Sequence, residues 1–507
     1  MPPTDPAWLA RRLRSSLRGP VDAGATRWPR VEPADEADLR LAVEIAAQSG
    51  VPVSVRGAGL DSPGAGALEA LVLDCRRLDK VLEFDRAAGR VEAQAGLSAA
   101  ALDAIVAPDG WRFAPDAPDR GEATLGGLLG VDARLRASPA TRMEARVDAV
   151  DALLVDGTVQ RFGPFGVADS TRLEGARASA LVSGLFEIAA REREVLARDW
   201  PMRTPPALGF RFTALGAIPG AAGDAGAAVN LARLLAGSRG TLAISRRIRL
   251  RLDRRPAHRR WLALAADTFA AGLAGLGAIA DRDPTTLALF ASSSLARGPG
   301  RSLAEQLAVP ATAGALLLAE FEGDDAARLA ADVERARLDC ATPALRPLRA
   351  SGAAMPIEAA RRLASLVDDQ RIAMAWRAPG PRATIIPEDC RLPLDRMAEA
   401  WRRIDELVTA RRLRVHWFAS GNDGRLSMRP ADAASARAMV RDGALAIAVA
   451  RIVRELGGAI DGERLDPAAR SSLASVQFGA AIVAAGEQAR ALFDPQRRLV
   501  PFVAGDD

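Results

Sequence analysis

Tyrosine is missing from this 507-residue chain, and histidine occurs only twice, at His258 and His416. The first absence excludes a phenol as general acid, and the second nearly excludes a metal site built from several histidines. Cysteine is also scarce, and Cys75, Cys340 and Cys390 have neither a metal-binding spacing nor the even number of a disulfide framework. Such cysteine usage favours a reducing compartment.

Long apolar runs and lysine are lacking as well. No stretch approaches about 18 uninterrupted apolar residues, and the N-terminus contains no apolar signal-peptide core. The sequence therefore predicts a soluble cytoplasmic protein without a membrane span. The basic groups are nearly all arginine, yet the formal net charge is only +5 and no dense basic tract occurs. We expect no nucleic-acid partner.

What the chain does contain is an alternation of helix and strand patterns, over a length sufficient for two or three domains. The polar, arginine-rich sequence of residues 1–27 indicates a short helix and an N-terminal arm. From 28 to 256 the apolar spacing switches between helical and strand periods. After Pro256 an alternating strand and Ala-rich helical stretches predict an α+β domain with an antiparallel sheet, and residues 431–507 are mainly helical.

Three glycine-rich segments lie at the ends of predicted strands or helices. Residues 56–61 read Arg-Gly-Ala-Gly-Leu-Asp after an alternating valine strand, and residues 123–127 read Ala-Thr-Leu-Gly-Gly. Residues 237–244 read Gly-Ser-Arg-Gly-Thr-Leu-Ala-Ile and continue into a strand with Ile248 and Leu250 on one face and arginines on the other. Each segment taken alone is either a plain turn or a loop whose amides can bind phosphate.

In this order the segments resemble blocks of FAD-linked oxidases of the vanillyl-alcohol-oxidase and D-lactate/glycolate dehydrogenase type. The family carries Arg-Gly-Gly-Gly-Thr-Ser, Ala-Thr-Ile-Gly-Gly and Gly-Ser-Glu-Gly-Thr-Leu-Gly-Ile at the matching places. Two further blocks, Glu-Asp-Cys-Arg-Leu-Pro at 388–393 and Phe-Asp-Pro at 493–495, also resemble family segments. The resemblance covers residues 28–503.

The resemblance implies an α+β fold of the p-cresol-methylhydroxylase (PCMH) type. Residues 28–256 are expected to form an FAD-binding domain of two α/β subdomains. Residues 257–430 are expected to form a substrate or cap domain with an antiparallel sheet. Residues 431–507 are expected to form a C-terminal helical segment that packs back on the FAD domain.

The resemblance also implies bound FAD. Leu60 stands where bicovalent relatives carry the flavin-linking histidine, so the FAD is expected to be non-covalent. Asp61 replaces a hydroxyl residue beside the diphosphate; a carboxylate about 5 Å from a phosphate charge costs on the order of 3 kcal/mol unless it points away or pairs with Arg56. The residues expected to contact FAD are Arg56, Gly57, Ala58, Gly59, Leu60, Asp61, Pro115, Asp116, Ala123, Thr124, Gly126, Gly127, Gly237, Ser238, Gly240, Thr241, Leu242 and Ile244.

Relatives that oxidise 2-hydroxy acids hold a divalent metal with two histidines and a glutamate, and a further histidine takes the hydroxyl proton. At the matching positions this chain has Phe418, Ser427, Glu463 and Arg464, so we expect no metal ion. His416 is interpreted as a strand-end histidine with a hydrogen-bond partner rather than as a ligand.

Arginines offer a substitute for the metal. Two interpretations of Arg377, Arg429 and Arg464 stay open: they form a cationic pocket in the cap that binds a substrate carboxylate, or each is a solvated surface residue. Glu463, Arg464 and Arg429 are therefore the catalytic candidates.

Two functions stay open at this point. One is an FAD-dependent oxidoreductase that moves hydride from a small hydroxy acid or alcohol to the flavin and serves an electron-acceptor protein. The other is a catalytically degenerate subunit, flavin-binding or cofactor-free, that supports a partner oxidoreductase. Fold alone does not decide between them.

Overall fold

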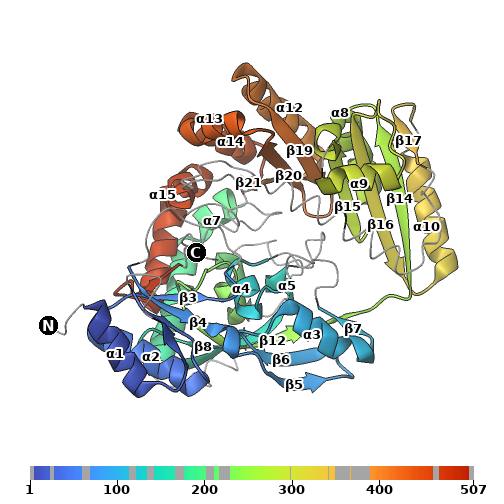
Figure 1. Ribbon diagram of the computed structural model, residues 1–507. Helices are drawn as coiled ribbons and strands as arrows, with labels where there is room; N and C mark the ends of the chain where they lie inside the picture. Colours follow the sequence, from blue (N-terminus) through green and yellow to red (C-terminus); the bar gives the residue numbers. More distant parts are fainter. Residues whose placement is uncertain are drawn as a thin grey trace.

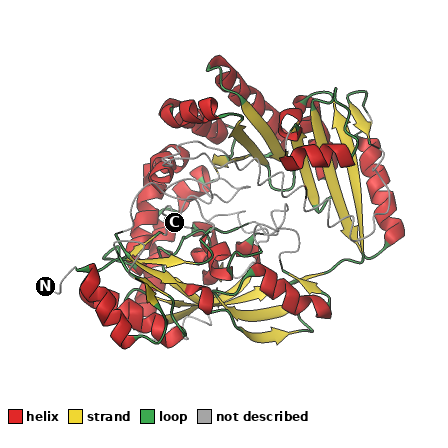
Figure 2. Ribbon diagram, in the orientation of Figure 1, coloured by secondary structure: helices red, strands yellow, loops and turns green. Residues whose placement is uncertain are grey.

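The computed structural model of the chain describes residues 5–22, 28–59, 69–113, 121–133, 142–165, 176–200, 211–215, 229–296, 298–340, 342–348, 366, 389–460 and 467–501. The elements form an N-terminal lobe and a cap lobe, which the chain first connects through residues 253–258 (Figure 1). Both lobes contain helices packed on sheets (Figure 2). The α+β fold expected from the sequence is confirmed.

The first sheet of the N-terminal lobe has five strands, and its central pairs are parallel. In spatial order the strands are β1 (Val21–Asp22), β2 (Arg30–Val31), β4 (Leu71–Asp74), β3 (Val53–Arg56) and β22 (Leu499–Val500). Helix α2 (Glu36–Ser49) lies between β2 and β3 in the chain and buries Leu39 and Val43 in the core of this sheet. Asp35 caps its first turn, and Gly50 ends it at a φ of 68°, where a side chain would be strained.

Helix α1 (Pro6–Ser16) belongs to the same core. Leu9 and Leu13 lie one helical turn apart and are both buried there, and β1 pairs with β2. The short helix predicted within the N-terminal arm of residues 1–27 is thus present as α1, and its apolar face packs into the lobe.

The second sheet of the N-terminal lobe is antiparallel. In spatial order its strands are β5 (Val81–Asp85), β6 (Arg90–Gln94), β12 (Ile244–Arg251), β8 (Val147–Leu153) and β9 (Val159–Phe162). In β12, Ile248 and Leu250 are buried whereas Arg249 and Arg251 are not, as the alternation predicts. The other elements of the lobe are α3 (Ala99–Val106), α4 (Leu125–Gly130), α5 (Met143–Arg146), α6 (Ala176–Arg191), α7 (Arg193–Asp199), the ribbon of β7 (Trp111–Arg112) with β13 (Asp253–Arg254), and the ribbon of β10 (Pro164–Phe165) with β11 (Val229–Asn230).

The cap lobe is built on an eight-stranded antiparallel sheet. In spatial order the strands are β17 (Leu345–Pro347), β14 (His258–Ala266), β16 (Ala315–Gly323), β15 (Thr286–Ala291), β19 (Val415–Ser420), β20 (Arg425–Pro430), β18 (Asp389–Arg391) and β21 (Ala459–Ile460). The outer face, with Leu262 and Leu289, packs on α8 (Phe269–Ala280), α10 (Ala326–Asp339) and α12 (Leu394–Ala410). The inner face carries Trp261, Phe290 and Phe418, which share a second core with α9 (Gly298–Gln306).

Arg112 of β7 joins the N-terminal lobe to the inner face of the cap sheet. Its guanidinium donates two hydrogen bonds to Glu322 of β16, at 3.0 and 2.7 Å, and Arg259 Nε lies 2.8 Å from the same carboxylate. The three side chains are at most 8% exposed. A bidentate pair shielded from water is strong and directional, so it fixes this end of the cap sheet against the N-terminal lobe.

The last helices lead back from the cap to the N-terminal lobe. After α13 (Ala433–Arg441) and α14 (Gly443–Glu455), α15 (Pro467–Phe493) packs on α6 and α7. Arg177 of α6 donates to the carbonyl oxygen of Leu492 at 2.8 Å, and β22 then pairs in parallel with β3. The sequence predicts these helices but not β22, because a two-residue strand has no readable period.

Glu36, in the first turn of α2, connects the two sheets of the N-terminal lobe. Its carboxylate accepts hydrogen bonds from Arg247 at 2.7 and 2.9 Å, from Gln94 at 3.3 Å, and from Arg246. Burial alone would raise the pKa of Glu36, but these hydrogen bonds outweigh burial and lower the pKa to about 2.

We expect Glu36→Gln to lower the free energy of unfolding at neutral pH by about 1–2 kcal/mol, a value discounted for solvent screening. Because the folded-state pKa lies below the unfolded value, the advantage of the wild type is complete above about pH 4.5 and is lost as the pH falls toward 2. Urea denaturation across this pH range measures the difference. Glu44→Gln, on the same helix, is the control, and a loss independent of pH would contradict the expectation.

Candidate cofactor and substrate site

Three glycine-bearing segments from distant parts of the sequence meet at the carboxyl end of β3. A Cβ at Gly57 would collide with Thr124 Oγ1, and a Cβ at Gly240 would lie 3.7 Å from Val55 Cβ. Gly237 and Gly240 have φ values of 81° and 73°, a region that favours glycine. The structure thus brings segments 56–59, 123–127 and 237–241 together.

Helix α4 holds the second and third segments in contact. Thr124 caps the helix by accepting a hydrogen bond from the Gly127 amide at 3.2 Å. At the other end, the carbonyl oxygens of Leu129 and Gly130 accept from the amides of Gly237 and Arg239, at 2.9 and 2.8 Å.

The loop after β3 has the properties of a phosphate cradle. Within the described part of the chain, the amide groups of Gly57, Ala58 and Gly59 donate no hydrogen bond. A Cβ at Gly59, whose φ is 74°, would lie 2.7 Å from Nη2 of Arg56, so the guanidinium lies against the loop. Open amides, a backbone without bulky side chains and a nearby cation fit a diphosphate group.

A buried ion cluster fixes the C-terminal end of α4. Asp132 accepts from Arg142 Nε at 2.6 Å and from the Glu144 amide at 2.9 Å, and it also pairs with Arg211. Asp132, Arg142 and Arg211 are at most 3% exposed, and Arg211 also lies 2.5 Å from Glu144. The charges balance within the cluster, so it supports the cofactor site rather than binding a ligand. The sequence analysis missed it, because Asp132 and Arg211 are 79 residues apart.

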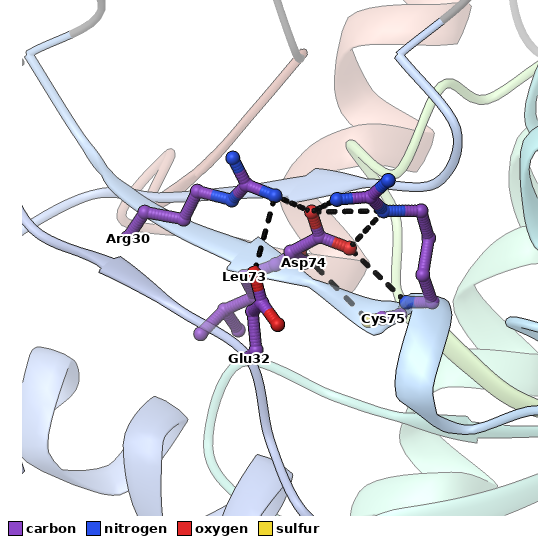
Figure 3. A network of polar contacts seen from close by, with 6 residues as sticks. Arg30, Glu32, Leu73, Asp74 and Cys75 are labelled. Atoms are coloured by element: carbon purple, nitrogen blue, oxygen red, sulfur yellow. Dashed lines mark hydrogen bonds and ion pairs between the residues drawn. The ribbon is translucent and has the colours of Figure 1, made fainter. Parts of the chain in front are cut away.

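Asp74, beside Arg56 in the sheet register, is neutralised in a similar way (Figure 3). Arg76 Nε donates to its carboxylate at 3.0 Å, and Arg30 forms a second ion pair with it. Burial and the nearby Asp74 raise the pKa of the Cys75 thiol to about 12, which makes this thiol a poor nucleophile. The charge of the Asp74 carboxylate, which lies next to the cradle, is thus balanced by Arg30 and Arg76.

A second polar cluster lies on the inner face of the cap sheet, on β18 and β20. Asp389 accepts from Arg429 Nη2 with both carboxylate oxygens at 3.0 Å, and it accepts from the Ser427 hydroxyl. The three residues are at most 4% exposed. Arg429 is therefore neither a solvated surface residue nor an open cation: it is buried and paired with Asp389, which the sequence analysis did not single out.

The two positions expected for metal ligands, Phe418 and Ser427, are cross-strand neighbours. Phe418 packs on Phe290, with ring centroids 5.1 Å apart, and so offers no ligand atom. His416 is half-buried and its Nδ1 lies 3.0 Å from Ser293 Oγ, as expected for a strand histidine with a hydrogen-bond partner. Among the described residues no three His, Cys, Asp or Glu side chains are placed to hold a metal ion, and the absence of a metal stays a prediction.

The other candidates of the sequence analysis divide into two sets. The described cofactor candidates lie in the three meeting segments or at the start of β12, and they are Arg56, Gly57, Ala58, Gly59, Ala123, Thr124, Gly126, Gly127, Gly237, Ser238, Gly240, Thr241, Leu242 and Ile244. The candidates outside the described residues are Leu60, Asp61, Pro115, Asp116, Arg377, Glu463 and Arg464. The role of each of these residues stays a prediction.

Two family models match the chain. The FAD binding domain matches residues 30–163, and the C-terminal domain of FAD linked oxidases matches residues 255–503. The chain belongs to the FAD-linked oxidase family. Its cofactor is FAD, and the cradle after β3 fits the diphosphate of that cofactor.

The curated relatives include D-2-hydroxyglutarate dehydrogenases from two bacteria. The chain is 25% identical over 493 residues to that of Escherichia coli K12, which is 93% of this chain and 47% of the relative. It is 24% identical over 492 residues to that of Pantoea ananatis, again 47% of the relative. The chain thus spans about half the length of these relatives.

Solved structures confirm the PCMH-type fold. The 4-ethylphenol oxidase of Gulosibacter chungangensis has a TM-score of 0.65 at 14% identity, and p-cresol methylhydroxylase has a TM-score of 0.64 at 11% identity. Each comparison covers 97% of this chain and 95% of the other. None of the helices in the described ranges is long and apolar enough to cross a membrane.

The close approach of Gly57 to Thr124 provides a test of the cofactor site. Gly57→Ala forces Thr124 Oγ1 out of its place, and we expect FAD affinity to fall about tenfold or more. In a Thr124→Ala background the same substitution should cost less, because the colliding oxygen is gone. Titration of apoprotein with FAD, followed by flavin fluorescence, measures both effects.

Gly277→Ala is the matched control, because a Cβ at this position of α8 meets nothing within 4 Å. Its FAD affinity should equal that of the wild type. Strictly additive losses for Gly57→Ala and Thr124→Ala would contradict the contact.

Proposed function

We propose that the protein is an FAD-dependent oxidoreductase that oxidises a small 2-hydroxy acid to the 2-oxo acid. The observation that carries the proposal is the meeting of the three glycine-bearing segments at β3, in a chain similar along 93% of its length to a D-2-hydroxyglutarate dehydrogenase. Bound FAD supplies, at flavin N5, the acceptor for the hydride that leaves the substrate carbon. The hydroxyl proton would pass to a basic side chain or to water, and an external acceptor would take up the two electrons.

The chain's own residues have separate tasks in this proposal. The amides of Gly57, Ala58 and Gly59 and the guanidinium of Arg56 would hold the diphosphate, and α4 with the 237–241 turn would orient the cofactor. In the cap, Asp389 and Arg429 form a buried ion pair that holds strands β18 and β20 in register on the inner face of the sheet. Glu463 and Arg464 remain predicted catalytic residues.

The expectations about domains, location and partners are also part of this proposal. We retain the division into an FAD-binding domain over 28–256, a cap domain over 257–430 and a C-terminal segment over 431–507, and we add α1 to the first. A cytoplasmic location and a separate electron-acceptor protein or partner subunit also belong to the proposal.

The cross-strand pair of Phe418 and Ser427 favours a second candidate function. Relatives that oxidise 2-hydroxy acids place metal-binding histidines at these positions, and a chain without them could support a partner oxidoreductase without turnover. This candidate predicts a flavin that binds but is not reduced by hydroxy acids.

The absorption spectrum of the purified protein and anaerobic reduction of its flavin test both candidates. We expect a flavin spectrum, release of all yellow colour on acid precipitation, and bleaching by at least one of glycolate, D-lactate and D-2-hydroxyglutarate. A flavin spectrum without bleaching supports the partner-supporting role. Colour retained in the pellet would show a covalent link despite Leu60.

We further expect flavin reduction to be independent of divalent metal. Phe418 offers no ligand atom, and Ser427 hydrogen-bonds to Asp389, which is already paired with Arg429. Dialysis against EDTA should leave the reduction rate within about twofold of the untreated protein. Loss of reduction that added Zn²⁺ or Mn²⁺ restores would overturn this expectation.

A further inference from the structure

A cavity of about 680 Å³ lies in the N-terminal lobe, apart from the cofactor segments. It is lined by β9, which is the outermost strand of the second sheet, by the first turns of α6, and by side chains of β6, β8 and β12. None of its lining residues belongs to segments 56–59, 123–127 or 237–241, and none belongs to the cap. A cavity of this size can enclose a small organic ligand.

The floor of this cavity is apolar. Four side chains that are at most 5% exposed form it, and they are Phe162, Leu181, Val182 and Leu231. Val159, the first residue of β9, adds a more open wall, because it is 45% exposed. A ligand that covers these groups removes apolar surface from water, so the floor favours an apolar chain.

The rim of the cavity carries more positive than negative charge. Its lining contains three arginines, Arg90, Arg161 and Arg249, and one carboxylate, that of Asp148. The arginine side chains are between 33% and 52% exposed, so they form the open side of the cavity. Arg90 lies 3.4 Å from Asp148 and Arg249 lies 3.6 Å from Glu83, and both ion pairs are longer than an ordinary hydrogen bond.

Arg161 pairs with carboxylates that lie outside the cavity. Its Nη1 donates to Asp151 at 2.9 Å and its Nη2 donates to Glu92 at 3.3 Å, and neither acid lines the cavity. A guanidinium has five N–H donors, so these contacts use only part of the group. Ion pairs exposed to water contribute little stability, so an anion at the rim can share the arginines with their present partners.

We propose that this cavity binds an anion with an apolar chain, of the class of medium-chain fatty carboxylates. The chain lies on the apolar floor, and the carboxylate lies at the rim beside Arg161 and Arg249. An uncharged chain would leave the rim unused, and a small anion would leave the floor in contact with water. The site does not depend on the proposed function, because its lining includes neither the cofactor segments nor the cap.

The experiment titrates the holoprotein with octanoate, octan-1-ol and acetate by isothermal titration calorimetry. These probes separate the contribution of the charge from that of the chain. We expect one octanoate to bind per chain, octan-1-ol to bind about tenfold more weakly, and acetate to give no heat of binding. Added salt should weaken the binding of octanoate but not that of octan-1-ol, because it screens exposed charges.

Substitutions at the exposed rim test the assignment without disturbing the core. Arg161→Gln and Arg249→Gln should each weaken octanoate binding about threefold, and the double variant about tenfold, with octan-1-ol unchanged. Val159→Asp adds a negative charge and removes apolar wall, so it should weaken octanoate binding about tenfold or more and octan-1-ol binding less.

Two control variants match these changes elsewhere in the chain. Arg40→Gln removes an exposed arginine of α2 that pairs with Glu44, and Leu338→Asp places a charge at an apolar side chain of α10 that is 56% exposed. Both should bind octanoate as the wild type does. The melting temperature of every variant shows whether its fold is retained.

Several results would overturn the proposed site. They are a wild type that does not bind octanoate, equal affinities for octanoate and octan-1-ol, and octanoate binding that the double arginine variant and Val159→Asp leave unchanged. Displacement of octanoate by D-lactate, or a change in the flavin absorbance when octanoate is added, would place the bound anion beside the cofactor instead and would also overturn it. Octanoate binding that depends on these three residues and leaves the flavin spectrum unchanged supports the site, whether or not hydroxy acids reduce the flavin.

Discussion

The cofactor site depends on a helix that is too short to be stable by itself. Helix α4 has six residues, and such a helix gains its geometry from tertiary contacts rather than from propensity. Thr124 fixes its first turn and touches Gly57, while Asp132 and two buried arginines fix its last turn. The amides of the 237–241 turn then attach to its final carbonyl groups. Both sides of the cradle are therefore positioned by the same helix.

The many arginines of the chain have a structural role that the small net charge does not reveal. The bidentate pair of Arg112 with Glu322 and the pair of Arg429 with Asp389, in which one Nη2 donates to both oxygens, each join elements that are distant in the sequence. Replacing one partner of such a pair leaves an uncompensated charge away from water, which destabilises more than the pair itself stabilises. The planar guanidinium suits these positions, because two parallel hydrogen bonds also set an orientation.

Local signals in the sequence predict much of this fold. Gly50 ends a helix where expected, β12 alternates as its sequence indicates, and the glycine segments meet as the family resemblance implies. The substrate side is harder to predict, because its contacts are set by strand register. Asp389 and Arg429 are 40 residues apart, and their contact depends on the register of β18 against β20. Neither fact has a periodic signature in the sequence.

The parallel pairing of β22 with β3 has a consequence for the order of folding. Residues 499–500 cover the edge of the strand that leads into the cofactor loop, although nearly the whole chain separates them from it. During synthesis that edge has no strand beside it until residues 499–500 have left the ribosome. An uncovered edge strand is a template for pairing with other chains, so a polypeptide that stops short of β22 exposes an aggregation site next to the future cofactor loop. The docking of β22 closes that edge and thereby links the cofactor loop to a segment that is translated long after it.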